Sequence, residues 1–261
     1  MSLKTSIIQM DIAFGNPNQN FLHAKTKIEE ASKENCDIIV LPELWTTGYD
    51  LTRLTEIADE NAQRTIAFLK EMAIKHHVHI IGGSVANKDS DGIYNTLIVV
   101  DNSGKIVHTY DKLHLFQLMD EHLYLKGGKS EGLFTLNDHI FASMICYDIR
   151  FPEWIRTHTT KGAEVIFVVA EWPMPRLSHW RSLLIARAIE NQCFVIACNR
   201  VGNDPNNVFA GHSIIIDPWG EIVAEAGDSE EILTASIELN KVREVRKLIP
   251  IFEDRRQDYY S

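Results

Sequence analysis

Short apolar runs alternate with helical stretches along this chain, and that alternation restricts its possible folds more than any other feature. Residues 37–41 (DIIVL) and 165–169 (VIFVV) are brief and almost wholly apolar, as is typical of strands buried on both faces. In the stretch between residues 18 and 35, Phe21, Ala24 and Ile28 recur at the spacing of one helical face. We therefore expect an α/β protein in which helices cover the faces of a sheet.

The same alternation continues through the second half of the chain. We expect further strands at residues 6–10, 79–83, 95–100, 106–110, 140–145, 194–197 and 213–216, and helices at 65–76, 152–160 and 178–192. Ser178 is expected to cap the last of these helices, and Gly82-Gly83 is interpreted as a turn. No linker or composition break divides the sequence. We therefore predict a single domain over residues 1–261, with either one helix-covered sheet or two such layers back to back.

Composition narrows the class of function. The chain has 26 basic and 36 acidic residues and a formal net charge of −10, which does not fit the basic surface that nucleic acid or an anionic membrane requires. No apolar run approaches the roughly 20 residues of a membrane-spanning helix, and the N-terminus has no secretory pattern. Four cysteines do not make a disulfide scaffold. These features predict a cytoplasmic protein that handles small molecules, with no nucleic-acid or membrane partner.

Three reactive side chains follow predicted strands, the position where α/β proteins usually bind ligands. They are Glu43 in LPE, Lys112 in DKLHLF and Cys146 in CYDIRFPE. Taken singly, each has a plainer interpretation: a surface carboxylate, a solvated ammonium and a buried packing thiol. Taken together, they offer a proton acceptor, a cation and a nucleophile. We also expect the helix that begins just after Cys146 to lower the thiol pKa and to stabilise an oxyanion.

The three motifs, in this order, resemble the signatures of the nitrilase superfamily of carbon–nitrogen hydrolases. The resemblance covers nearly the whole chain and implies a Glu-Lys-Cys triad at Glu43, Lys112 and Cys146. It also implies a four-layer αββα sandwich that dimerises through helices into an eight-layer assembly. A homodimer is therefore expected, with no metal and no organic cofactor.

The resemblance further implies a mechanism. Glu43 would take the proton of Cys146, and the thiolate would attack an amide carbon while Lys112 and the backbone N–H of Tyr147 hold the oxyanion. Ammonia would leave to give a thioester, which water activated by Glu43 would hydrolyse. Many relatives have a second glutamate near the site, and Glu121 is the best candidate here, although an exposed loop acid is the alternative.

Trp172-Pro173, Arg176, His179-Trp180 and residues 186–192 resemble the bacterial ω-amidase branch, whose members hydrolyse the terminal amide of 2-oxoglutaramate or 2-oxosuccinamate. Such a substrate carries a carboxylate, so we expect Arg176 to bind it, with Trp172 as a further substrate-binding residue. Glu171 stands where many relatives have asparagine, and it would repel an anionic substrate unless Arg176 or a histidine neutralises it.

Other functions stay open at this point. Within enzymes, an N-carbamoyl amino acid or aliphatic amide hydrolase is the nearest rival, and an acyltransferase would use the same thioester. Outside them are a non-catalytic interaction protein of the same fold and a thiol redox sensor. His76, His77 and His79 lack the usual context of a metal site. Asp148 and Arg150 are expected to form a structural ion pair or hydrogen-bond network near Cys146.

Overall fold

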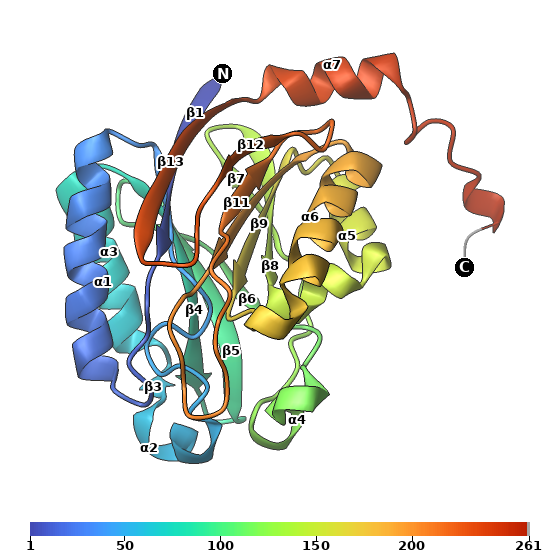
Figure 1. The fold of residues 1–261 in the computed structure, drawn as a ribbon. Helices are drawn as coiled ribbons and strands as arrows, with labels where there is room; N and C mark the ends of the chain where they lie inside the picture. Colours follow the sequence, from blue (N-terminus) through green and yellow to red (C-terminus); the bar gives the residue numbers. More distant parts are fainter. Residues whose placement is uncertain (260–261) are drawn as a thin grey trace.

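The apolar runs form the centres of two mixed β-sheets in the computed structural model, which describes residues 1–259 (Figure 1). The first sheet has the order β13-β1-β2-β4-β5-β6, with β3 paired to β4, and the second has the order β12-β11-β10-β9-β8-β7. The strands of the first sheet are β1 (Ser2–Gln9), β2 (Ile38–Val40), β3 (Asp59–Glu60), β4 (His79–Lys88), β5 (Ile93–Val100), β6 (Ile106–Asp111) and β13 (Glu231–Glu238). Those of the second are β7 (Leu133–Leu136), β8 (His139–Ile145), β9 (Val165–Ala170), β10 (Phe194–Asn199), β11 (Ile214–Ile216) and β12 (Ile222–Glu225).

Helices cover the outer face of each sheet, so the layers follow the order helix, sheet, sheet, helix (Figure 1). On one side lie α1 (Pro17–Ala31) and α3 (Gln63–His76), and on the other α5 (Pro152–Thr159) and α6 (Leu177–Asn191). The remaining helices are α2 (Leu54–Ile57), α4 (Glu121–Tyr124) and α7 (Asn240–Leu248). None of the helices among residues 1–259 is long and apolar enough to cross a membrane.

The strand β2 shows why its run is apolar at every position. Ile38 and Val40 pack in the core between the two sheets, whereas Ile39 packs against the helices α1 and α3. Successive side chains of a strand point to opposite faces, and here both faces are covered. The parallel pairing of β1 with β2 and of β2 with β4 is the arrangement that such runs predict.

Two local predictions are wrong. The helix α6 begins at Leu177 and its N-cap is Arg176, without a side-chain cap, because a 3-10 turn over Met174–Arg176 already directs the chain into the helix. Gly82-Gly83 is a register shift inside β4 and not a turn. A Cβ at Gly83, where φ is +61°, would lie 2.1 Å from the Pro42 carbonyl oxygen, so glycine lets β4 approach the segment that carries Glu43.

Candidate active site

The ends of three strands bring the three motifs together. Glu43 follows β2, Lys112 follows β6 directly, and Cys146 follows β8 directly. The first two strands belong to one sheet and the third to the other, so the site lies where the two sheets face each other. All three side chains are buried, which excludes the interpretations as a surface carboxylate and a solvated ammonium.

Lys112 is bound by two carboxylates. Its Nζ donates to Glu43 Oε1 at 2.9 Å and to Glu121 Oε1 at 2.6 Å, and all three side chains are fully buried. Burial by itself would lower the pKa of Lys112, but the charges of Glu121 and Glu43 outweigh it and hold that pKa well above its ordinary value. The ammonium is therefore a permanent cation at the centre of the site.

Glu43 is held by donors on both of its oxygens. Besides Lys112, Oε1 accepts from Asn95 Nδ2 at 2.8 Å and from the Tyr49 hydroxyl at 3.3 Å, and Oε2 accepts from the backbone N–H of Glu171 at 2.8 Å. These contacts come from both sheets and fix the orientation of the carboxylate toward Cys146.

Glu121 is buried at the start of α4, so the alternative of an exposed loop acid is wrong. Its Oε1 accepts from the Tyr49 hydroxyl at 2.5 Å as well as from Lys112, and its Oε2 accepts from the Phe116 backbone N–H at 2.7 Å. Burial raises the pKa of Glu121, and Lys112 opposes that rise. Glu121 therefore belongs to the buried hydrogen-bonded cluster around Lys112.

Cys146 opens a 3-10 helix over Cys146–Arg150, which leads into α5. Its backbone has φ +46°, a left-handed conformation that a residue with a Cβ adopts at a cost of about 1–3 kcal/mol. Burial, followed by the negative charge of Glu43, holds the pKa of the thiol well above its ordinary value. The expected net lowering of the thiol pKa is therefore wrong, because desolvation and the charge of Glu43 raise that pKa.

Asp148 stabilises the turn that carries the thiol. Its Oδ2 accepts from the Ile145 backbone N–H at 3.0 Å and from the Tyr110 hydroxyl at 2.7 Å, while Oδ1 contacts both the backbone N–H and Nδ1 of His114 at 3.2 and 2.7 Å. The expected hydrogen-bond network at Asp148 is confirmed, and it ties the Cys146 turn to the segment that carries Lys112. The ion pair with Arg150 is absent from residues 1–259.

A small pocket opens beside Cys146. It is lined by aromatic, apolar and charged side chains, namely Phe116, Met119, Cys146, Tyr147, Arg150, Glu171, Trp172, Pro173 and Arg176. Trp172 is buried and donates from Nε1 to the Arg176 carbonyl oxygen at 2.8 Å. The structure thus brings together all the residues expected in the site except for the partner of Glu171.

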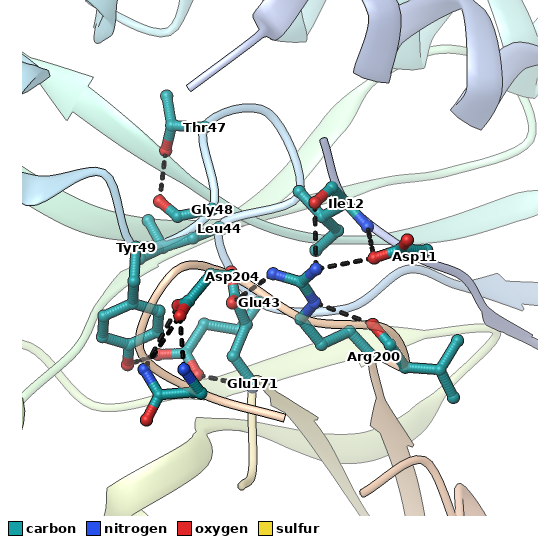
Figure 2. A network of polar contacts seen from close by, with 12 residues as sticks. Asp11, Ile12, Glu43, Leu44, Thr47, Gly48, Tyr49, Glu171, Arg200 and Asp204 are labelled. Atoms are coloured by element: carbon teal, nitrogen blue, oxygen red, sulfur yellow. Dashed lines mark hydrogen bonds and ion pairs between the residues drawn. The ribbon is translucent and has the colours of Figure 1, made fainter. Parts of the chain in front are cut away.

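Arg200 holds that partner position, which the sequence interpretation gave to Arg176 or a histidine. Its Nη1 donates to Glu171 Oε2 at 2.9 Å, and its Nη2 donates to Asp11 Oδ1 at 2.8 Å and to the Ile12 carbonyl oxygen at 2.9 Å (Figure 2). Both Arg200 and Glu171 are fully buried. Arg176 is half-buried, its guanidinium lies 5.4 Å from the centre of the Phe116 ring, and no carboxylate pairs with it in the described part of the chain.

Three residues of the cluster escaped the sequence interpretation. Tyr49 and Asn95 lie in stretches with no reactive motif, and only the fold places their polar groups on Glu43 and Glu121. Arg200 has no role in the sequence interpretation, although its position directly after the apolar strand β10 is a usable signal. Residues 1–259 contain no group of three or more His, Cys, Asp or Glu side chains placed to hold a metal ion.

Comparisons with known proteins identify the family. The family model described as Carbon-nitrogen hydrolase matches residues 4–247. The chain is 56% identical over 260 residues to the 2-oxoglutaramate amidase of Bacillus subtilis (strain 168), with 100% of both chains covered. It is 35% identical over 254 residues to Omega-amidase YafV of Escherichia coli (strain K12), covering 97% of this chain and 96% of the other.

The fold is shared as well. The crystal structure of a CN-hydrolase superfamily protein from Xanthomonas campestris matches with a TM-score of 0.92 at 30% identity, covering 98% of this chain and 97% of that one. Sequence and structure therefore lead to one assignment, which confirms the predicted family. The chain belongs to the carbon–nitrogen hydrolases of the nitrilase superfamily.

Proposed function

We propose that the protein hydrolyses the terminal amide of a small 2-oxo acid, 2-oxoglutaramate or 2-oxosuccinamate, to the dicarboxylate and ammonia. The observation that carries this proposal is the full-length 56% identity to a 2-oxoglutaramate amidase. The buried cluster of Glu43, Lys112 and Cys146 supports it, because these groups fit acyl transfer through a thioester.

In the first half of the reaction, Glu43 accepts the proton of Cys146 as sulfur attacks the amide carbon. The raised pKa of the thiol means that the proton leaves only when a nearby base takes it, and Glu43 supplies that base. Lys112 Nζ and the backbone N–H of Tyr147 stabilise the oxyanion. The C–N bond then breaks, and Glu43 returns its proton to the departing nitrogen, which leaves as ammonia.

In the second half, Glu43 takes a proton from water, whose oxygen attacks the thioester carbon. The C–S bond breaks, the acid is released, and the proton returns to sulfur. Glu121 holds Lys112 in place through the 2.6 Å ion pair, so we assign it a positioning role. Lys112 keeps a carboxylate partner when Glu43 carries the proton, because Glu121 takes no part in the proton transfer and its charge also raises the pKa of Lys112.

At the other end of the pocket, Arg176 pairs with the substrate carboxylate. No carboxylate neutralises it among residues 1–259, and a guanidinium binds a carboxylate in a bidentate fork. Trp172 supplies an apolar wall for the short carbon chain, with Arg150 stacked 4.8 Å from the centre of its ring.

We further propose that residues 1–261 act as one carbon–nitrogen hydrolase domain and form a cytoplasmic homodimer. Thiols stay reduced in the cytosol, and all four cysteines are free. Ile189 on the outer face of α6 is half exposed, and pairing of this helical layer between two subunits would give the expected eight-layer assembly. Light scattering on the purified protein measures the subunit number.

Ammonia release from 2-oxoglutaramate by the wild type and by Cys146→Ala tests the function, with asparagine, glutamine, N-carbamoyl amino acids and aliphatic amides as comparison substrates. We expect fast release from the 2-oxo amide and a loss of at least about 10³-fold in the variant. If ammonia is released from a different substrate and this release is lost in the variant, Cys146 remains the assigned nucleophile, but the assigned substrate is wrong. A folded wild type that is inactive on the whole panel would favour a non-catalytic interaction protein.

A further inference from the structure

Glu171 lines the pocket and has a buried polar atom that no residue in the described part of the chain satisfies. Its Oε2 is held by Arg200, but its Oε1 is buried and has no hydrogen-bond partner in the described part of the chain. The residue lines the same pocket as Cys146, and its own backbone N–H binds Glu43. An unpartnered buried carboxyl oxygen is destabilising, so a bound substrate is the natural source of its partner.

The charges around Glu171 decide which kind of partner fits. The pKa of Glu171 is raised to about 8, first of all by burial and to a smaller extent by the charges of Glu43 and Asp204, while Arg200 opposes the rise. Asp11 shares the Arg200 guanidinium. At neutral pH the group is therefore mainly a carboxylic acid, and with Arg200 on Oε2 the proton belongs on Oε1.

The other groups facing Glu171 leave this proton available. Cys146 and Tyr49 are neutral, because the pKa of each is held well above its ordinary value, first of all by burial. Arg150 and Arg176 line the pocket as cations, and they have no oxygen to accept the proton of Glu171.

We propose that Glu171 is a specificity-determining residue whose protonated Oε1 donates a hydrogen bond to an oxygen of the 2-oxo acid end of the substrate, while Arg200 holds Oε2. This inference rests on the proposed function. An ionised Glu171 would repel the anionic substrate, whereas the neutral acid adds a donor and no negative charge. The conflict between a glutamate at this position and an anionic substrate is thereby removed.

Binding to the inactive Cys146→Ala protein tests the proposal, because this background removes titration of the thiol. Calorimetry with 2-oxoglutaramate gives Kd between about pH 6.5 and pH 9. Only the neutral fraction of Glu171 binds well, so we expect Kd to rise about tenfold from pH 7 to pH 9. Adding Glu171→Gln, which mimics the protonated group, removes the pH dependence and keeps Kd at pH 7 within about threefold.

Glu164→Gln in the same background is the matched control, since Glu164 is another buried glutamate, bound to His139 and outside the pocket. It should retain the tenfold rise. A Kd that does not depend on pH in Cys146→Ala, or a loss of tenfold or more at pH 7 on adding Glu171→Gln, overturns the proposal.

Infrared spectra without substrate separate this proposal from the assigned reaction. The difference between Cys146→Ala with and without Glu171→Gln should contain a protonated-carboxyl band near pH 6 that is lost near pH 9.5. Absence of this band overturns the neutral Glu171, whatever the substrate is. If the band is present but 2-oxoglutaramate does not bind, and the wild type hydrolyses a different amide, the proposed function fails and the assigned hydrogen-bond acceptor fails with it.

Discussion

We expect Asp148→Asn to lower the activity of Cys146 by displacing the turn that carries it, although Cys146 itself is unchanged. The carboxylate accepts from Ile145 and Tyr110 on one oxygen and contacts His114 twice on the other. An asparagine keeps one acceptor oxygen and turns an N–H₂ group toward two former partners. Two hydrogen bonds to a charged acceptor are lost, each contributing about 1.5–3 kcal/mol, so the free energy of unfolding should fall by about 3–6 kcal/mol.

The same change should lower the rate. Cys146 is held at φ +46° directly after Ile145, whose backbone N–H is fixed by Asp148. Release of this contact lets the turn relax, and a displacement of about 1 Å at a reacting atom lowers the rate about 10²-fold. We therefore expect kcat to fall by about two orders of magnitude in protein that is still folded.

Thermal unfolding and ammonia release at 20 °C measure the two effects. A loss of 3–6 kcal/mol corresponds to a fall in Tm on the order of 10 °C or more for a chain of this size. Asp217→Asn is the control, because Asp217 is also buried and binds the backbone N–H groups of Trp219 and Glu221, but far along the chain from the motifs. It should lower Tm alone. An Asp148→Asn protein with kcat within threefold of the wild type would refute the positioning role, and an unchanged Tm would refute the energetic argument.

Further substitutions test the cluster and the pocket. Glu121→Gln leaves Lys112 with a single carboxylate, and we expect kcat to fall about 10²-fold; unchanged kcat would contradict its positioning role. Tyr49→Phe removes a hydroxyl that contacts both glutamates and should lower kcat about tenfold or more with little change in KM, as steady-state kinetics will show. Arg176→Met should raise KM for 2-oxoglutaramate about tenfold to 10²-fold and leave a neutral aliphatic amide unaffected, whereas the exposed control Arg181→Met should change neither. Equal effects of Arg176→Met on both substrates would exclude recognition of the carboxylate.

The central strands could be predicted from the sequence because their apolar runs depend on burial alone. The run at residues 37–41 contains β2 (Ile38–Val40), and the run at 165–169 lies within β9. The strand β13 and the helix α7 have no such signal. The first five residues of β13 are all partly buried and only Ile237 is fully buried, so the strand shows no clear alternation. It is fixed by its antiparallel pairing with β1, in which Ser2 pairs with Glu238 and Gln9 with Glu231. A contact between the two ends of the chain cannot be predicted from local periodicity.

The site residues likewise include some that the sequence predicts and others that depend on the fold. Glu43, Lys112 and Cys146 could be named because each reactive residue follows a strand within a distinctive motif. The partner of Glu171 could not, because Arg200 reaches it from a neighbouring strand, and nearness in sequence favoured Arg176 instead. The direction of the thiol pKa was predicted wrongly for a similar reason. The helix start is visible in the sequence, whereas the complete burial beside Glu43 that outweighs it depends on how the two sheets meet.

The cations of the site fall into two groups with different tasks. Lys112 and Arg200 are fully buried. Lys112 is bound to the carboxylates of Glu43 and Glu121, and Arg200 is bound to the Asp11 carboxylate and to Glu171. An anionic substrate therefore meets cations that already have acidic partners, and these cations can hold fixed positions for catalysis. Arg150 and Arg176 line the pocket, and within residues 1–259 neither is paired with a carboxylate. Their charge remains available to attract a carboxylate, so the pocket can bind an anion without weakening the ion pair that keeps Lys112 charged and in place for the oxyanion.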